Sequence, residues 1–66
     1  MKKIKNALEM KYKGDIAEAE ANVWIYLKNP AGIGEHPEII AAIDTQIEKI
    51  ANLNLKLEAL DKYVEL

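Results

Sequence analysis

Proline and glycine gather in one stretch of this 66-residue chain, and that stretch constrains its fold more than any other feature. Both prolines and two of the three glycines fall between Asn29 and Pro37, while the flanking segments contain Gly14 as their one breaker. Because proline and glycine end helices and form turns, the stretch divides the chain into two halves of about thirty residues. The sequence therefore predicts one domain, residues 1–66, with two long elements joined by a loop over about 29–36.

The second half has the stronger hydrophobic pattern. From Ile39 onward, its apolar residues alternate steps of four and three, with Gln46 as the one polar member. This spacing is typical of a helix that packs along another helix. Pro37 suits the first helical position, and Glu38 places negative charge at the positive end of the helix dipole. We therefore expect a helix over about 37–64.

The first half is also predicted to be a helix, over about 3–28. Steps of four and three place one set of residues on a single face: Ile4, Leu8, Tyr12, Ile16, Ala19, Val23 and Tyr26. Gly14 interrupts this face at a cost of about 1 kcal/mol relative to alanine. Pro30 disfavours helical conformation in the residue before it, so the helix should end there.

A short connection folds two helices of this length back on each other, which predicts an all-α fold, an antiparallel two-helix hairpin. The side chains expected along the seam between the helices are Ile16, Ala19, Tyr26, Ile43, Ile50, Leu53, Leu57 and Leu60. Residues 1–13 carry five lysines and one glutamate, and the remainder carries four lysines and ten acids, so this fold brings a basic start beside an acidic end. Gln46 and Asn54 are interpreted either as buried polar residues that fix the helix register or as edge residues bonded to water.

Apolar residues outside the seam predict that the hairpin associates with itself. They surround the last turns of the first helix, flank the seam of the second, and include one position opposite the seam. Burying such a side chain contributes about 1.5–3 kcal/mol, which is large beside the stability of so small a chain. We expect a homodimer, as a four-helix bundle, with an interface of Val23, Trp24, Ile25, Leu27, Ile47 and Leu55.

Few side chains in this sequence can carry chemistry. The chain contains no cysteine, serine or arginine and a single histidine, which leaves almost nothing for a nucleophile–base pair or a thiolate metal site. His36 lies beside Glu35 and near Glu38, but a metal needs three or four converging ligands, so a capping or loop-ordering role is favoured. The Gly32–Gly34 turn lacks the strand, the lysine and the hydroxyl residue of a phosphate loop. We predict a non-enzymatic protein-interaction or structural module without catalytic residues, cofactors or metals.

A group of lysines near the start supports an alternative function, that of a small nucleic-acid-associated accessory protein. The residues that would contact phosphates are Lys2, Lys3, Lys5, Lys11 and Lys13. Such contacts give weak, strongly salt-dependent binding. The chain as a whole is acidic, with a net charge of −2, and nearby carboxylates compete for the same lysines. A nucleic-acid partner is therefore the second hypothesis.

The sequence also bears on location. Its longest continuous apolar run, Val23–Leu27, is far shorter than the roughly 20 residues that span a bilayer. Charged residues interrupt every other candidate apolar segment near the start. We expect no membrane partner and a cytoplasmic protein.

The loop and the start of the second helix resemble a known group of proteins. The loop reads Asn-Pro-Ala-Gly-Ile-Gly-Glu-His-Pro, within residues 26–39, and is followed by Ala-Ile-Asp-Thr-Gln-Ile-Glu-Lys-Ile-Ala over residues 42–51. It is similar to short helical-hairpin proteins of T4-like tailed phages of marine bacteria and cyanobacteria, which carry an Asn-Pro-x-Gly-x-x-Glu-His-Pro turn between two helices. The resemblance covers about half of the chain. It implies a phage-encoded protein in the host cytoplasm and brings no activity or functional residues with it.

Overall fold

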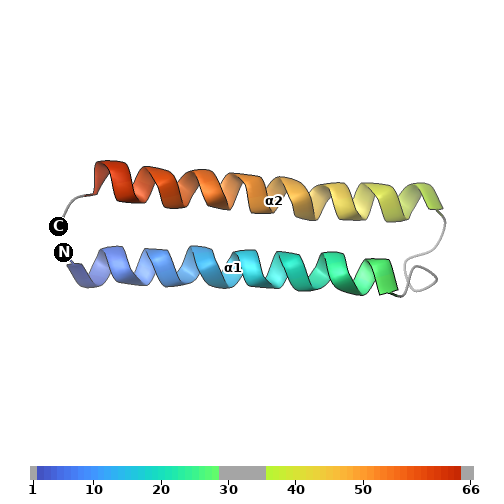
Figure 1. Cartoon of the computed structure of the whole chain (residues 1–66), viewed down its shortest axis with the longest axis horizontal. Helices are drawn as coiled ribbons and strands as arrows, with labels where there is room; N and C mark the ends of the chain where they lie inside the picture. Colours follow the sequence, from blue (N-terminus) through green and yellow to red (C-terminus); the bar gives the residue numbers. More distant parts are fainter. Residues whose placement is uncertain (1, 29–35, 65–66) are drawn as a thin grey trace.

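The protein is a two-helix hairpin in a computed structural model that describes residues 2–28 and 36–64 (Figure 1). Helix α1 spans Lys2–Lys28 and helix α2 spans His36–Tyr63. The helices lie side by side and run in opposite directions, so the start of α1 lies beside the end of α2. The predicted all-α antiparallel hairpin is therefore confirmed, with helix bounds within a residue of those expected. The Gly32–Gly34 turn, Glu35 and the side chain of His36 lie outside the described residues.

The inner face of α2 follows the predicted seam. Leu53 and Leu60 are 9% and 7% exposed, and Gln46 between the helices is 7% exposed. The remaining seam positions of α2 are half-buried: Ile39, Ile43, Ile50, Leu57 and, just beyond the helix, Val64. On α1, the expected seam residues Ile16, Ala19 and Tyr26 are also buried or half-buried. The alternation of steps of four and three thus places one side of α2 against α1, as expected for helices packed along their length.

The inner face of α1 is more polar than the sequence pattern predicted. Ile4 was expected on this face, but its side chain is 62% exposed. The other predicted residues of this face are buried or half-buried, and four polar residues of α1 are half-buried as well: Lys5, Glu9, Asp15 and Asn22. Lys5 can occupy such a position because its aliphatic stem packs against the partner helix while its ammonium group reaches Asp61, 3.5 Å away.

Two helices enclose only one seam, and the resulting core is thin. Ala19 is the most buried core residue, at 2% exposure, and no large side chain among the described residues is fully buried. Small residues at such a position let two helices approach closely but contribute little apolar area. Neither helix, over the described residues, contains an apolar stretch long enough to cross a membrane.

Candidate functional site

A polar pair crosses the seam near the middle of the hairpin. The Asn22 amide nitrogen donates a hydrogen bond to the side-chain oxygen of Gln46 at 3.3 Å. Gln46 is buried, as expected for a polar residue that fixes the helix register. Asn54 is exposed, as expected for a residue at the edge of the seam. Asn22 was not predicted at the seam from the sequence, although its position three residues after Ala19 continues the inward line of α1. A cross-helix pair of this kind favours one register of the two helices over slipped ones.

An open apolar groove of about 300 Å³ lies between the helices in the half of the hairpin next to the loop. We call this surface the loop-proximal groove, and its lining residues are Glu20, Val23, Trp24, Leu27, Ile47 and Ile50. Trp24 is 62% exposed, Leu27 65% and Ile47 50%, so large apolar side chains face solvent here. The structure therefore brings together four of the six residues predicted at a self-association interface: Val23, Trp24, Leu27 and Ile47.

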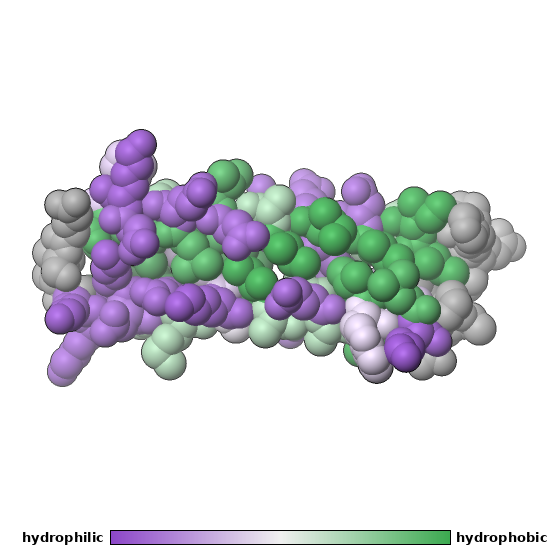
Figure 2. All heavy atoms as spheres, in the orientation of Figure 1, coloured by the Kyte–Doolittle hydropathy of each residue, from purple (hydrophilic) through white to green (hydrophobic). Residues whose placement is uncertain are grey.

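The groove occupies one side of the seam, which we call the front face. The positions that flank the seam on this side are Glu9, Ile16, Val23, Ile40, Ile47, Asn54 and Asp61. Figure 2 shows hydrophobic side chains gathered across both helices on the loop-proximal half and hydrophilic ones toward the chain ends. Ile40, which is 57% exposed, lies two helical turns from Ile47 on the same side of α2 and extends the apolar surface toward the loop.

The other two predicted interface residues lie elsewhere. Ile25 is 50% exposed, but it is two residues from Val23 and therefore about 200° around the helix, which places it across the seam from the groove. Leu55 is 62% exposed on the outward side of α2, in the half of the hairpin near the chain ends. Neither residue lines the loop-proximal groove. Of the six predicted interface residues, four thus lie together in the loop-proximal groove, and Ile25 and Leu55 lie apart from it.

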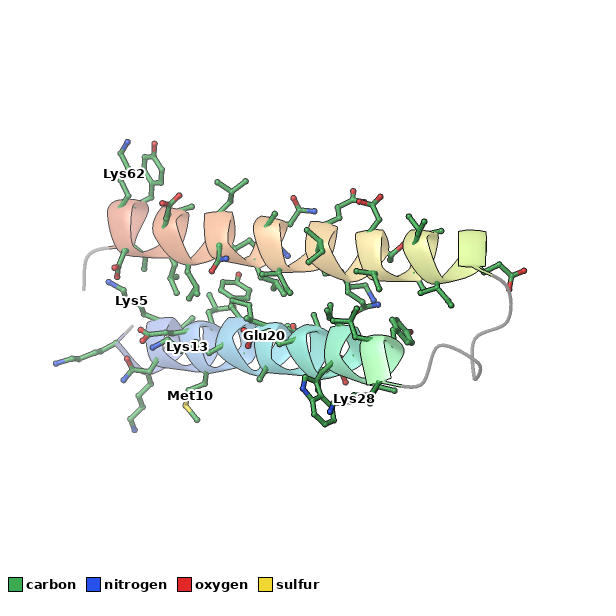
Figure 3. The ribbon with its side chains drawn as sticks, turned by 45° about the vertical axis from the view of Figure 1, so that its right-hand side comes forward. Lys5, Met10, Lys13, Glu20, Lys28 and Lys62 are labelled. Atoms are coloured by element: carbon green, nitrogen blue, oxygen red, sulfur yellow. The ribbon has the colours of Figure 1, made fainter. Side chains whose placement is uncertain are left out.

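Charged side chains cover the other half of the front face. The Lys13 ammonium donates to the Glu9 carboxylate at 2.8 Å, and this contact raises the pKa of Lys13, mainly through the hydrogen bond and then through the charge of Glu9. Lys5 reaches across to Asp61 at 3.5 Å, as the charge distribution predicted for an antiparallel hairpin. In Figure 3, Lys5 lies between the helices, whereas Lys62 points away from α1. These ion pairs make the surface next to the chain ends hydrophilic.

A second apolar groove, of about 310 Å³, lies near the chain ends. Its lining residues are Leu8, Tyr12, Lys56, Ala59, Leu60, Tyr63 and Val64. Lys56 and Tyr63 flank the seam of α2 on the side opposite Ile47, so this groove belongs to the back of the hairpin. The ammonium group of Lys56 lies 5.5 Å from the centre of the Tyr12 ring, where it covers part of the aromatic surface.

The lysines proposed for nucleic-acid binding are partly engaged with carboxylates. Lys5 contacts Asp61 at 3.5 Å, Lys11 contacts Asp15 at 3.2 Å and Lys13 contacts Glu9 at 2.8 Å. Each such pair offers an intramolecular partner that a phosphate would have to displace. Nucleic-acid binding by these lysines stays a prediction.

A further pocket has a lining of mixed charge. It measures about 380 Å³ and lies on the back of the hairpin. Its lining residues are Asp15, Glu18, Ala19, Gln46, Lys49, Asn52, Leu53 and Lys56. Two acids and two lysines leave it no net charge with which to select an ion. Over residues 2–28 and 36–64, no three histidine, cysteine, aspartate or glutamate side chains come together as metal ligands.

Comparison with known proteins adds no family to this picture. No protein-family model matches the sequence, no curated protein matches it, and no solved structure matches the hairpin. The resemblance of the loop to phage proteins therefore stays a prediction. The loop-proximal groove is the surface on which a functional proposal can rest.

Proposed function

We propose that the chain is a non-enzymatic helical interaction module that forms a homodimer by packing its loop-proximal groove against a second copy. The observation that carries this proposal is the cluster of exposed Trp24, Leu27 and Ile47 in one groove that spans both helices. Two such hairpins, packed face to face, form a four-helix bundle where they overlap. The surface then serves to hold two chains together.

The energetics favour a partner for this groove. A domain of about 60 residues buries only about 60% of the surface that its unfolded chain exposes, so its stability is marginal. Each fully buried leucine or isoleucine contributes about 1.5–3 kcal/mol. Trp24, Leu27 and Ile47 are half or more exposed, so about half or more of this stabilisation is realised only when a second surface covers them. A stable interface buries about 800 Å² per partner. The hairpin exposes 5150 Å², so about a sixth of its surface would suffice.

Two isoleucines of equal exposure give a matched test of this interface. Ile47 lines the groove and Ile25 does not, yet both are 50% exposed, so a glutamate at either position leaves the seam intact. We expect the wild-type chain to sediment as a dimer at micromolar concentration. Ile47→Glu should weaken dimerisation at least about 100-fold because it buries a charge in an apolar contact. Ile25→Glu should dimerise like the wild type.

Sedimentation equilibrium over a range of concentrations measures both variants, and circular dichroism checks that their helix content is unchanged. A monomer mass for the wild-type chain at micromolar concentration contradicts the proposal. Equal weakening by Ile25→Glu would place the interface on the other side of the seam.

The loop resemblance extends the proposal to a phage protein that acts in the host cytoplasm. It is supported by the motif from Asn29 to Pro37 and by nothing in the packing of the helices. Fractionation of host cells that express the tagged chain would test the location. Recovery of the chain in the envelope fraction contradicts a cytoplasmic role.

A further inference from the structure

We infer that the two copies of the dimer lie with their loops at opposite ends and overlap only along their loop-proximal halves. The loop-proximal half comprises residues 17–28 and 36–51, and the terminal half comprises residues 2–16 and 52–64. This inference rests on the proposed dimer and states how the second copy sits in the groove. The assembly is then a short four-helix overlap from which two charged hairpin ends project.

The front face is apolar along only part of its length. From Ile16 to Leu27 on α1, the residues that flank the seam are apolar except for Glu20, and Ile40 and Ile47 lie opposite them on α2. Beyond Ile16, toward the chain ends, the face carries ion-paired side chains (Figure 2). A contact along the full length would bury these charges, and burying ion pairs costs more than it returns unless every group finds a partner.

Two arrangements place the front faces together with two-fold symmetry. When the axis runs along the helices, the loops lie at the same end, so the terminal halves face each other as well. When the two-fold axis runs across the helices, the loops lie at opposite ends. A shift of one copy along the direction of the helices then confines the overlap to the apolar part. Only the second arrangement covers the groove while it leaves Glu9, Lys13 and Asp61 in water.

Net charge favours the same arrangement. Among the described residues, the loop-proximal half carries two lysines and five acids, a net of −3, and the terminal half carries seven lysines and four acids, a net of +3. With the loops at the same end, like charges coincide along the whole dimer, whereas with the loops at opposite ends only the two loop-proximal halves, each with a net of −3, face each other and the two +3 halves lie apart. With the loops at opposite ends and the overlap centred near Val23 and Ile47, Glu38 lies level with the start of the partner's terminal half. Opposite charges then approach within about one Debye length of 8–10 Å.

Distances between single labels distinguish the two arrangements. The chain has no cysteine, so Lys3→Cys and Glu48→Cys each accept one nitroxide label, and both positions are exposed. With the loops at opposite ends, the Lys3 labels should lie about 55–60 Å apart, because about 38 residues at 1.5 Å each separate them. With the loops at the same end, they should lie within about 30 Å. The Glu48 labels should lie within about 30 Å in both cases.

Each pattern of distances in a double electron–electron resonance measurement has one meaning. A long Lys3 distance with a short Glu48 distance supports the inference. Short distances at both positions overturn it and leave the proposed dimer standing. Absence of any dipolar signal at Glu48, with a monomer mass in sedimentation, removes the dimer and this inference together.

Scattering by the unlabelled protein provides a second measurement that needs no substitution. The single hairpin is 47 Å long, measured between Cα atoms. A dimer whose overlap is centred near Val23 and Ile47 should be about a third longer than one hairpin, from the 1.5 Å rise per residue. A dimer with the length of one hairpin contradicts the inference.

Discussion

The two halves of this hairpin differ in their most buried residues and in the chemistry of their front face. In the terminal half, Leu53 and Leu60 are buried between the helices and the front face carries ion pairs. In the loop-proximal half, the buried residues are Ala19 and Gln46, while the large apolar side chains of the groove face solvent. On the front face, exposed apolar side chains in the loop-proximal half thus give way to ion pairs in the terminal half.

This difference indicates what each half needs for stability. Burial of leucine supplies the main driving force for packing, so the terminal half gains its stability within one chain. A small residue and an amide pair supply less, and the exposed apolar area of Trp24, Leu27 and Ile47 contributes only when a second surface covers it. The comparison explains why we place the partner at the loop-proximal half.

The largest effect should come from the seam of the terminal half. Leu60 is 7% exposed, and Leu60→Ala should lower the free energy of unfolding by about 2–4 kcal/mol, because it removes buried apolar atoms and leaves a cavity. Leu55 is a leucine in the same half with 62% exposure, so Leu55→Ala should change it by less than about 0.5 kcal/mol. Urea denaturation at one fixed protein concentration measures both. Equal losses would mean that the seam does not carry the stability of this half.

A smaller effect is expected from the polar pair of the loop-proximal half. Gln46→Leu alone should cost about 1 kcal/mol, because the Asn22 amide loses its partner at a half-buried position. The double variant Asn22→Leu/Gln46→Leu should regain that loss or exceed it, since no unpaired amide remains. Thermal unfolding at fixed concentration measures the three proteins. Additive losses in the double variant would mean that the hydrogen bond plays no part.

The same double variant makes the interior of the two halves alike. Because a buried polar residue disfavours alternative registers and oligomers, its removal should broaden the range of assemblies. Sedimentation velocity should show species beyond the dimer that we propose for the wild type. A single unchanged species would assign the choice of partner to the groove alone.

The sequence predicted α2 better than α1, and the reason is physical. In α2 the apolar residues form one stripe, from Ile39 to Val64, and the stripe faces inward as expected. In α1 apolar residues also lie outside the predicted line, so the pattern marks the inward face less sharply. The inward line there includes Lys5, Asp15 and Asn22 because the stronger stripe of α2 sets the packing.

The groove was only partly predictable for a related reason. Composition located an excess of apolar residues at the end of α1, but it could not assign them to sides of the seam. That assignment depends on which residues of α1 face α2. Because Ala19 and Asn22 face α2, Val23 lies on one side of the seam and Ile25 lies on the other.

The ion pair across the terminal half should contribute less than the polar pair. Lys5 and Asp61 lie 3.5 Å apart, with the aspartate side chain 82% exposed. A double-mutant cycle of Lys5→Ala and Asp61→Ala should give a coupling of about 0.2–1 kcal/mol that falls at high salt. Urea denaturation in low and high sodium chloride measures it. A coupling that is independent of salt would contradict an electrostatic origin.

The smallest expected effect is the change in stability when Lys13, which forms an exposed ion pair with Glu9, loses its proton at high pH. The hydrogen bond and the charge of Glu9 raise the pKa of Lys13 above its ordinary value of 10.5. A raised pKa stabilises the folded chain fully below the ordinary value, and this contribution disappears as the pH rises through the folded value. We therefore expect this contribution to stability to be lost only at pH above about 10.5. In the Glu9→Gln variant, the pKa of Lys13 should return toward its ordinary value, which NMR titration measures. An unchanged pKa in that variant would mean that Glu9 does not hold Lys13. Because both groups are exposed, the terminal half should keep its packing when this pair is lost, whereas a charge in the loop-proximal groove should separate the two chains.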